Sequence, residues 1–161
     1  MRTYNKLNKI LFFVLTSYFL LSCGYQPILN KENQKFTISE FILEGNKRLG
    51  GLLKNNLITS KKKEENKLVL TIKSSKKTSI ANKSQTGKIL TYAVTINFDI
   101  TATNNADNKI MFSRVYTQKQ NYGASDVYLD TINSEKEVVK TIIESVANKM
   151  QIGLNSIYQE K

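Results

Sequence analysis

Apolar and polar residues alternate most clearly between residues 90 and 101. One face of a strand would carry six apolar residues, namely Leu90, Tyr92, Val94, Ile96, Phe98 and Ile100. β-Branched and aromatic side chains suit such a half-buried pleated surface. An earlier alternation of Leu68, Leu70 and Ile72 predicts a second strand, which the parity of Ile80 would extend. The polar residues 81–87 then predict the turn between the two strands.

A third strand is predicted after the turn-forming residues 104–108, because Asn and Asp tolerate positive φ. This strand would run from Lys109 to about Gln120, and residues 121–126 would form a loop around Gly123. The sequence does not decide which face of this strand is buried. Arg114 shares the parity of Phe112, whereas Val115 has the other parity, so either a bulge or a sheet buried on both faces would fit.

Residues 36–43 predict the first strand, with a bulge or kink around Ser39 where the apolar parity slips, and with its end at Gly45. The next apolar stripe has helical spacing from residue 47 to about residue 59 and consists of Leu49, Leu52, Leu53 and Leu57. Gly50 and Gly51 should weaken that helix by roughly 1 kcal/mol each. Residues 61–66, five charged residues followed by Asn66, predict a solvated turn.

The last apolar stripe predicts the longest helix. Ser134 could cap it, with Glu137 closing a capping box, and helical spacing continues to about Tyr158. About 24 residues would make a helix roughly 36 Å long. The resulting order is strand, helix, strand, strand, strand, helix. It predicts an α+β two-layer sandwich, in which a mainly antiparallel sheet of about four strands is covered by two helices on one face.

The first 22 residues have the parts of a secretory signal. Arg2, Lys6 and Lys9 precede a 12-residue apolar run, and Cys23 follows Ser22. About 20 apolar residues are needed to span a bilayer, so the run is too short. Cys23 has no disulfide partner within the chain, because it is the sole cysteine. We expect cleavage before Cys23 and lipidation there, with a cleaved signal beside a chance cysteine as the alternative. Residues 1–22 would be the signal, 23–35 a lipidated tether and 36–161 the domain.

Composition narrows the function further. Without residues 1–22, the chain keeps 21 basic and 13 acidic residues, a net charge of +8. Such a charge favours a polyanionic partner, and the export signal argues against nucleic acid. The chain has no histidine, which removes Ser–His–Asp chemistry and most zinc sites. We therefore expect no enzyme, no metal and no cofactor other than the N-acyl and S-diacylglycerol lipid on Cys23.

Three features of the chain point to a known family: the opening Cys23-Gly24-Tyr25-Gln26-Pro27, the order of elements, and the loop before a long final helix. In these features the chain resembles the LptE family of lipopolysaccharide-assembly lipoproteins. The resemblance implies a lipoprotein in the periplasmic leaflet of the outer membrane. There it would plug and help assemble the LptD β-barrel and contact lipopolysaccharide. Gly24 agrees with that location.

The resemblance also implies which part of the domain meets the ligand. Basic residues around the central strand–loop–strand region would contact lipopolysaccharide phosphates, and the candidates in this chain are Lys73, Lys76, Lys77, Lys83 and Lys88. Ordinary solvated surface charge is the alternative for each lysine. Two other functions stay open for the chain, namely binding of a polyanion without any barrel and service to another envelope machine.

Overall fold

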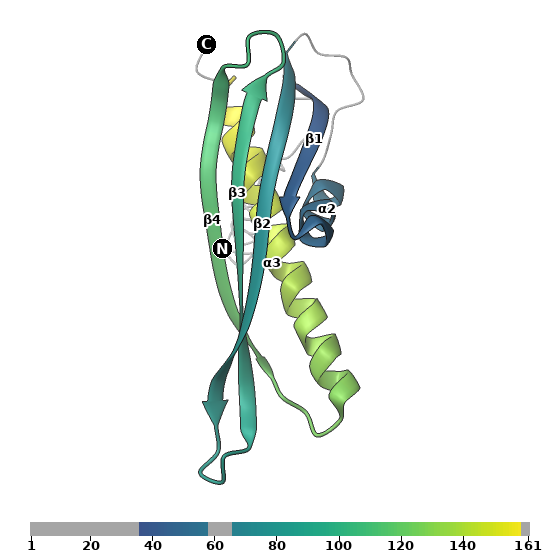
Figure 1. Cartoon of the computed structure of the whole chain (residues 1–161), viewed down its shortest axis with the longest axis vertical. Helices are drawn as coiled ribbons and strands as arrows, with labels where there is room; N and C mark the ends of the chain where they lie inside the picture. The colour runs from purple at the N-terminus through teal and green to yellow at the C-terminus, as the bar shows by residue number, and fades with distance from the viewer. Residues whose placement is uncertain (1–35, 58–65, 159–161) are drawn as a thin grey trace, which may run out of the picture.

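The computed structural model describes residues 36–57 and 66–158. The predictions for the signal, for Cys23, for the tether and for most of the 61–66 turn lie outside these residues. The elements follow the order β1 (Thr37–Gly45), α2 (Lys47–Asn56), β2 (Lys67–Lys83), β3 (Ile89–Asn104), β4 (Ile110–Gly123) and α3 (Tyr128–Ser156). This order matches the predicted one (Figure 1).

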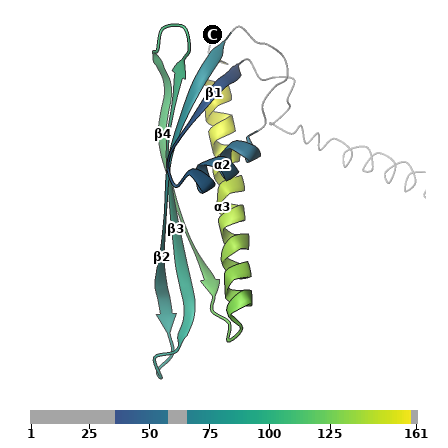
Figure 2. The same cartoon turned by 45° about the vertical axis from the view of Figure 1, so that its right-hand side comes forward.

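The sheet has four strands in the order β1-β2-β3-β4. β1 runs parallel to β2, and the other two pairs are antiparallel. Both helices lie on one side of the sheet (Figure 2). The predicted two-layer α+β sandwich is therefore confirmed.

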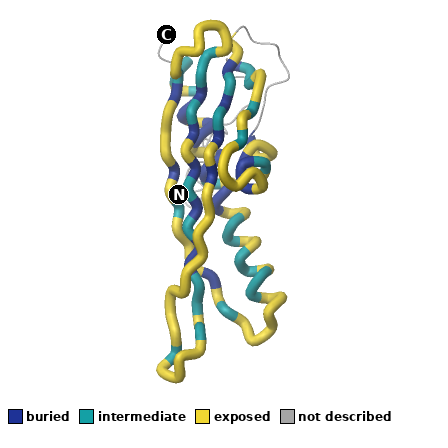
Figure 3. The backbone as a smooth tube through the Cα atoms, viewed as in Figure 1, coloured by how far each residue is buried: buried dark blue, intermediate teal, exposed yellow. Residues whose placement is uncertain are grey.

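The core lies between the helices and one face of the sheet (Figure 3). In β3 the predicted parity holds, since Ile96, Phe98 and Ile100 are fully buried. Against them pack fully buried residues of both helices, such as Leu53 of α2 and Val146 of α3. Burial of each large apolar side chain contributes about 1.5–3 kcal/mol, which explains why the glycine-weakened α2 still forms.

The predicted irregularity in β1 is a bulge at Ser39. The register with β2 shifts between Ile38 and Glu40. The Ser39 hydroxyl donates a hydrogen bond to the Leu68 carbonyl, with 3.0 Å between the oxygens. The extra residue restores the parity, so that Ile38 and then Phe41 and Leu43 pack on the core side.

The turn between β1 and α2 is fixed to β2 at one buried residue. Ser74 donates its hydroxyl to the Asn46 carbonyl at 2.7 Å, and the Asn46 N–H donates to the Ser74 carbonyl at 2.8 Å. Gly45 has a φ of +68°, and a Cβ there would lie 2.3 Å from the Ser74 carbonyl oxygen, so only glycine fits. The Asn46 side chain then caps α2 by accepting from the N–H of Leu49.

β4 has one buried face and one open face. Phe112, Tyr116 and Tyr122 are buried against the helix layer, and a register shift near the start of the strand provides the bulge. Arg114 has the same parity and is exposed, and its guanidinium lies over the Phe112 ring, 5.6 Å from the ring centroid. Val115 on the other face is 63% exposed. Burial on both faces is thus excluded for this strand.

The predicted start of the last helix was wrong. α3 begins at Tyr128, six residues before Ser134, so Ser134 lies inside the helix and forms no capping box. The N-cap residue is Val127, and no side chain caps the helix there. Ser125 holds the preceding loop instead, because its hydroxyl accepts from the Val127 N–H and its own N–H donates to the Thr131 hydroxyl at 2.8 Å. The sequence did not indicate this start, because the exposed residues after Ser125 have no helical apolar stripe.

Two strands are longer than predicted. β2 continues through Ile80 to Lys83, which leaves only a short turn before β3, and β4 continues through the predicted loop to Gly123. Polar residues form strand here because the neighbouring strands supply the ladder, as in the pairing of Tyr92 with Tyr122. At about 3.3 Å per residue, β2 spans about 55 Å, so the β2–β3 hairpin extends beyond the helices (Figure 1). Among the described residues, no helix combines the length and apolarity needed to cross a bilayer.

Candidate functional site

The sheet face opposite the helices is polar. Side chains alternate along a strand, so Thr95, Asn97 and Thr101 point away from the buried face that carries Ile96 and Ile100. No element in residues 36–57 or 66–158 packs on this open face (Figure 2). A long, uncovered face rich in threonine and asparagine can form hydrogen bonds with another polar surface.

Two of the predicted ligand-binding lysines, Lys73 and Lys77, lie on the open face of β2. Lys73 is directly opposite Asp99 of β3 and next to Glu44 of β1, so acidic residues flank it. Lys77 is directly opposite Thr95. It therefore has a different electrostatic environment from Lys73, although both side chains emerge from the same strand.

Lys77 belongs to a cationic row that crosses three strands. Thr95 pairs with Lys77 on one side and with Lys119 of β4 on the other. Strands lie about 4.8 Å apart, so the Cα atoms of the two lysines are about 10 Å apart. The ammonium groups can converge on one phosphate or bind two neighbouring ones.

Lys76 points to the other side of the sheet. Its Nζ lies 2.7 Å from Oε1 of Glu135 on α3, and the same carboxylate oxygen accepts from the Thr78 hydroxyl at 3.3 Å. Lys76 therefore joins the sheet to α3. The structure does not bring Lys76 together with Lys77, because consecutive strand residues point to opposite faces.

Lys83 and Lys88 lie at the hairpin end of the molecule. Lys83 ends β2 and is exposed. The Lys88 ammonium lies 2.5 Å from Oδ1 of Asp126, in a largely exposed ion pair. Pairs of this kind contribute little to stability. The five predicted lysines thus occupy three places: the open face, the helix side and the hairpin end.

Sequence reasoning missed an apolar patch at that same end. Val127, Tyr128 and Leu129 are consecutive and exposed, and Tyr128 is 78% exposed. The Ala124 N–H donates to the Leu90 carbonyl at 2.9 Å, so the exposed Leu90 lies next to the loop that leads to these residues. Three successive apolar residues without periodicity were the available signal. Exposed apolar patches of this kind are typical of contact surfaces.

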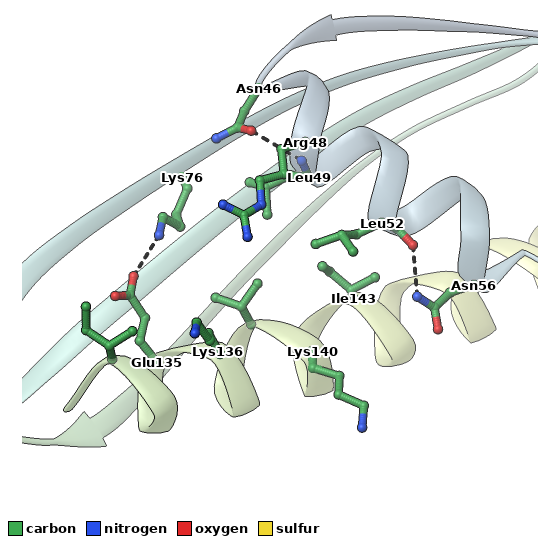
Figure 4. Close-up of a pocket in the computed structure, with 12 residues that line it drawn as sticks. Asn46, Arg48, Leu49, Leu52, Asn56, Lys76, Glu135, Lys136, Lys140 and Ile143 are labelled. Carbon is green, nitrogen blue, oxygen red and sulfur yellow. Dashed lines mark hydrogen bonds and ion pairs between the residues drawn. The ribbon is translucent and has the colours of Figure 1, made fainter. Parts of the chain in front are cut away.

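Sequence reasoning also missed a groove between α2 and α3. It has a volume of about 480 Å³, and residues of β2, α2 and α3 line it. Arg48 of α2 points across it toward α3, while Lys76 reaches Glu135 at its side (Figure 4). No sequence spacing could predict this groove, because it depends on how the two helices cross.

A cluster of aromatic residues closes the hairpin end of the helix side. The Tyr92 and Tyr122 rings stack with their centroids 5.5 Å apart. Burial raises the pKa of the Tyr122 phenol above its usual value of 10.0, and the negative charge of Glu135 raises it further. The phenol therefore stays neutral at physiological pH and acts as an ordinary hydrogen-bonding group.

The described residues offer surfaces for contact. In the described part of the chain, no group of three or more acidic or cysteine side chains could hold a metal ion. The available chemistry is hydrogen bonding on the open face, cation–anion contact at the lysine row, and apolar contact at the hairpin end and in the groove.

Comparison with known proteins shows the fold. Neither a protein-family model nor a curated protein sequence matches the chain. Among solved structures, it is similar to rare lipoprotein B from Shewanella oneidensis, with a TM-score of 0.56 and 14% identity over 75% of this chain and 97% of that one. Lipoprotein B from Nitrosomonas europaea gives a TM-score of 0.60 and 12% identity over 84% and 93%. A minor lipoprotein from Acinetobacter baumannii gives a TM-score of 0.54 and 16% identity over 76% of this chain and 91% of that one. The chain therefore shares the fold of these bacterial lipoproteins.

Proposed function

We propose that the chain is a lipid-anchored envelope protein of the LptE type. In this role it sits in the periplasmic leaflet of the outer membrane, plugs and helps to assemble an LptD-type β-barrel, and contacts lipopolysaccharide. It catalyses no reaction. The lipid on Cys23 holds it at the membrane, and the domain acts by binding.

The observation that carries the proposal is the fold. The similarity covers nearly the whole of the bacterial lipoproteins compared, so the domain matches them as a unit. The sequence adds an independent argument, because an export signal directly precedes the sole cysteine of the chain. Fold and signal together favour an envelope lipoprotein over an enzyme.

The open sheet face supports a position inside a barrel. The interior of an outer-membrane barrel is polar. The open face presents polar side chains such as Thr95, Asn97 and Thr101, which can form hydrogen bonds with such an interior. The helices meanwhile keep the apolar face of the sheet covered.

The length of the domain fits the same role. The described chain starts beside the beginning of β2, since Thr37 pairs with Lys67, and the hairpin lies at the other end of β2. About 55 Å separates these two ends, compared with an apolar barrel band of roughly 25 Å. A domain held by its lipid at one end can therefore reach through a barrel and place Tyr128 and the Lys77 row near the far side.

Affinity capture tests the proposal. The acylated chain, extracted in neutral detergent, should retain a very large outer-membrane barrel that peptide mass spectrometry identifies. Thr101→Arg should reduce capture by placing a bulky cation on the open face, whereas Asn148→Arg on the exposed surface of α3 should not. If no barrel is recovered with the unaltered chain, the plug function is wrong.

The cationic row favours a second candidate, a lipoprotein that binds a polyanion without a barrel. Lys77 and Lys119 flank Thr95 on an uncovered face. This candidate predicts lipopolysaccharide binding by the isolated protein that weakens with salt, since screening acts over about 8 Å at physiological ionic strength. Binding that survives Lys77→Glu with Lys119→Glu would exclude the row as the site.

A further inference from the structure

The groove between α2 and α3 has an apolar floor. Its apolar lining comes from both helices, namely Leu49, Leu52, Ile132, Val139 and Ile143. Leu52 is 40% exposed and points toward Ile143 across the groove (Figure 4). Leu49 and Ile143 are already buried, whereas Leu52, Ile132 and Val139 keep exposed surface. An apolar group that covers these three side chains would therefore be stabilised.

The rim of the groove is cationic. Arg48, Lys76, Lys136 and Lys140 line it together with one acidic residue, Glu135. Lys76 already engages Glu135 at 2.7 Å. No ion pair involves Arg48, Lys136 or Lys140 within residues 36–57 and 66–158. The groove therefore has an excess of positive charge that none of its own acidic side chains neutralises.

We infer that this groove binds one anionic amphiphile, a single alkyl or acyl chain that carries a phosphate headgroup. The chain would lie along the floor against the exposed surface of Leu52 and Val139. The phosphate would meet Arg48, whose planar guanidinium can donate two parallel hydrogen bonds, and Lys136. Lys140 points away from the groove in Figure 4 and would add only a longer-range charge.

The size of the groove limits the ligand. About 480 Å³ lies within the range of small-molecule sites, 300–1,000 Å³, which suits one chain and one headgroup. A lipid with several chains would leave most of its apolar surface outside. The site therefore goes beyond the proposed barrel function and would bind ligand on the isolated protein.

Photo-crosslinking tests this site on the full acylated chain in digitonin micelles, because the steroid-type detergent offers no competing alkyl chain. The probe is dodecyl phosphate with a diazirine in its chain, and the same chain ending in a hydroxyl is the neutral probe. Peptide mass spectrometry should place the phosphate probe within residues 48–56 and 132–143. Excess inorganic phosphate alone should not compete, since it lacks the chain.

Charge-neutralising variants provide the control. Arg48→Gln with Lys136→Gln should reduce phosphate-probe labelling about a hundredfold, because each of the two side chains loses a charged hydrogen bond that contributes about a factor of ten. Lys47→Gln with Lys149→Gln removes the same charge from exposed positions outside the groove and should leave labelling unchanged. Thermal unfolding checks that both pairs remain folded.

Three results would overturn the inference. Labelling outside both segments would exclude the groove. Equal labelling by the neutral probe would show a purely apolar cleft, and competition by inorganic phosphate would show a plain anion site. Because no barrel is present, failure here would leave the capture experiment unaffected.

Discussion

Replacing Gly51 by alanine should stabilise the domain, whereas replacing Gly153 by alanine should not. Both glycines lie inside helices, Gly51 in α2 and Gly153 in α3. Alanine is favoured over glycine in a helix interior by about 1 kcal/mol. Helix propensity alone therefore predicts that both substitutions stabilise the protein, and the surroundings decide whether they do.

The two sites differ in what a new methyl group would meet. A Cβ on Gly51 finds no heavy atom within 4 Å, so Gly51→Ala should raise the free energy of unfolding by about 1 kcal/mol. A Cβ on Gly153 would lie 2.8 Å from Cε2 and 3.1 Å from Cζ of Phe112, a buried ring. Overpacking of this kind costs about 1–3 kcal/mol, which leaves Gly153→Ala neutral to about 2 kcal/mol less stable.

Urea unfolding followed by far-ultraviolet circular dichroism measures both changes, with the midpoint read at a constant m-value. Phe112→Leu provides the control, because a smaller side chain should relieve the contact. In a double-mutant cycle, Gly153→Ala and Phe112→Leu should therefore couple favourably. If Gly153→Ala stabilises the protein as much as Gly51→Ala does, the close packing of α3 on β4 is wrong.

Three other predictions concern an ion pair, a buried phenol and the packing of α2 on the sheet. A double-mutant cycle on Lys76 and Glu135 should give a coupling of about 0.5 kcal/mol that shrinks in about 1 M salt, since the pair is partly exposed; a salt-independent coupling would contradict this. Tyr122 should ionise above pH 10 in absorbance titrations, and Glu135→Gln should lower its pKa. In the native state Tyr122 keeps its proton longer than in the unfolded state, so its contribution to stability is present below pH 10 and is lost as the pH rises further. In urea unfolding, Leu53→Ala should lower the free energy of unfolding by about 2–5 kcal/mol, because Leu53 is fully buried, and Leu52→Ala should lower it by less than about 1 kcal/mol. Equal losses would contradict the side of α2 that faces the core.

Local pattern was sufficient to predict the order of elements and the buried face of the central strands. The alternation around Ile96 and Phe98 has a period of two, and side chains in a strand must follow it. The parity slip at Ser39 likewise indicated a bulge, because one extra residue shifts every later side chain to the opposite face. Such features depend only on neighbours along the chain.

The limits of the elements were decided by neighbours across the fold. β4 continues to Gly123 because β3 provides hydrogen-bonding partners, although the residues there are polar. α3 begins at Tyr128 because Ser125 and Thr131 hold its first turn, and nothing periodic marks that turn in the sequence. The helical stripe that begins near Ser134 marks where α3 meets the core, rather than where it starts.

The candidate surfaces also depend partly on composition and partly on tertiary structure. Residue types alone predicted a cationic domain, because net charge follows from composition. Tertiary structure decided that Lys76 faces α3 while Lys77 faces the open sheet, because strand alternation separates adjacent side chains. It also created the groove beside Arg48, since only the packing of α2 and α3 on one sheet brings its lining together.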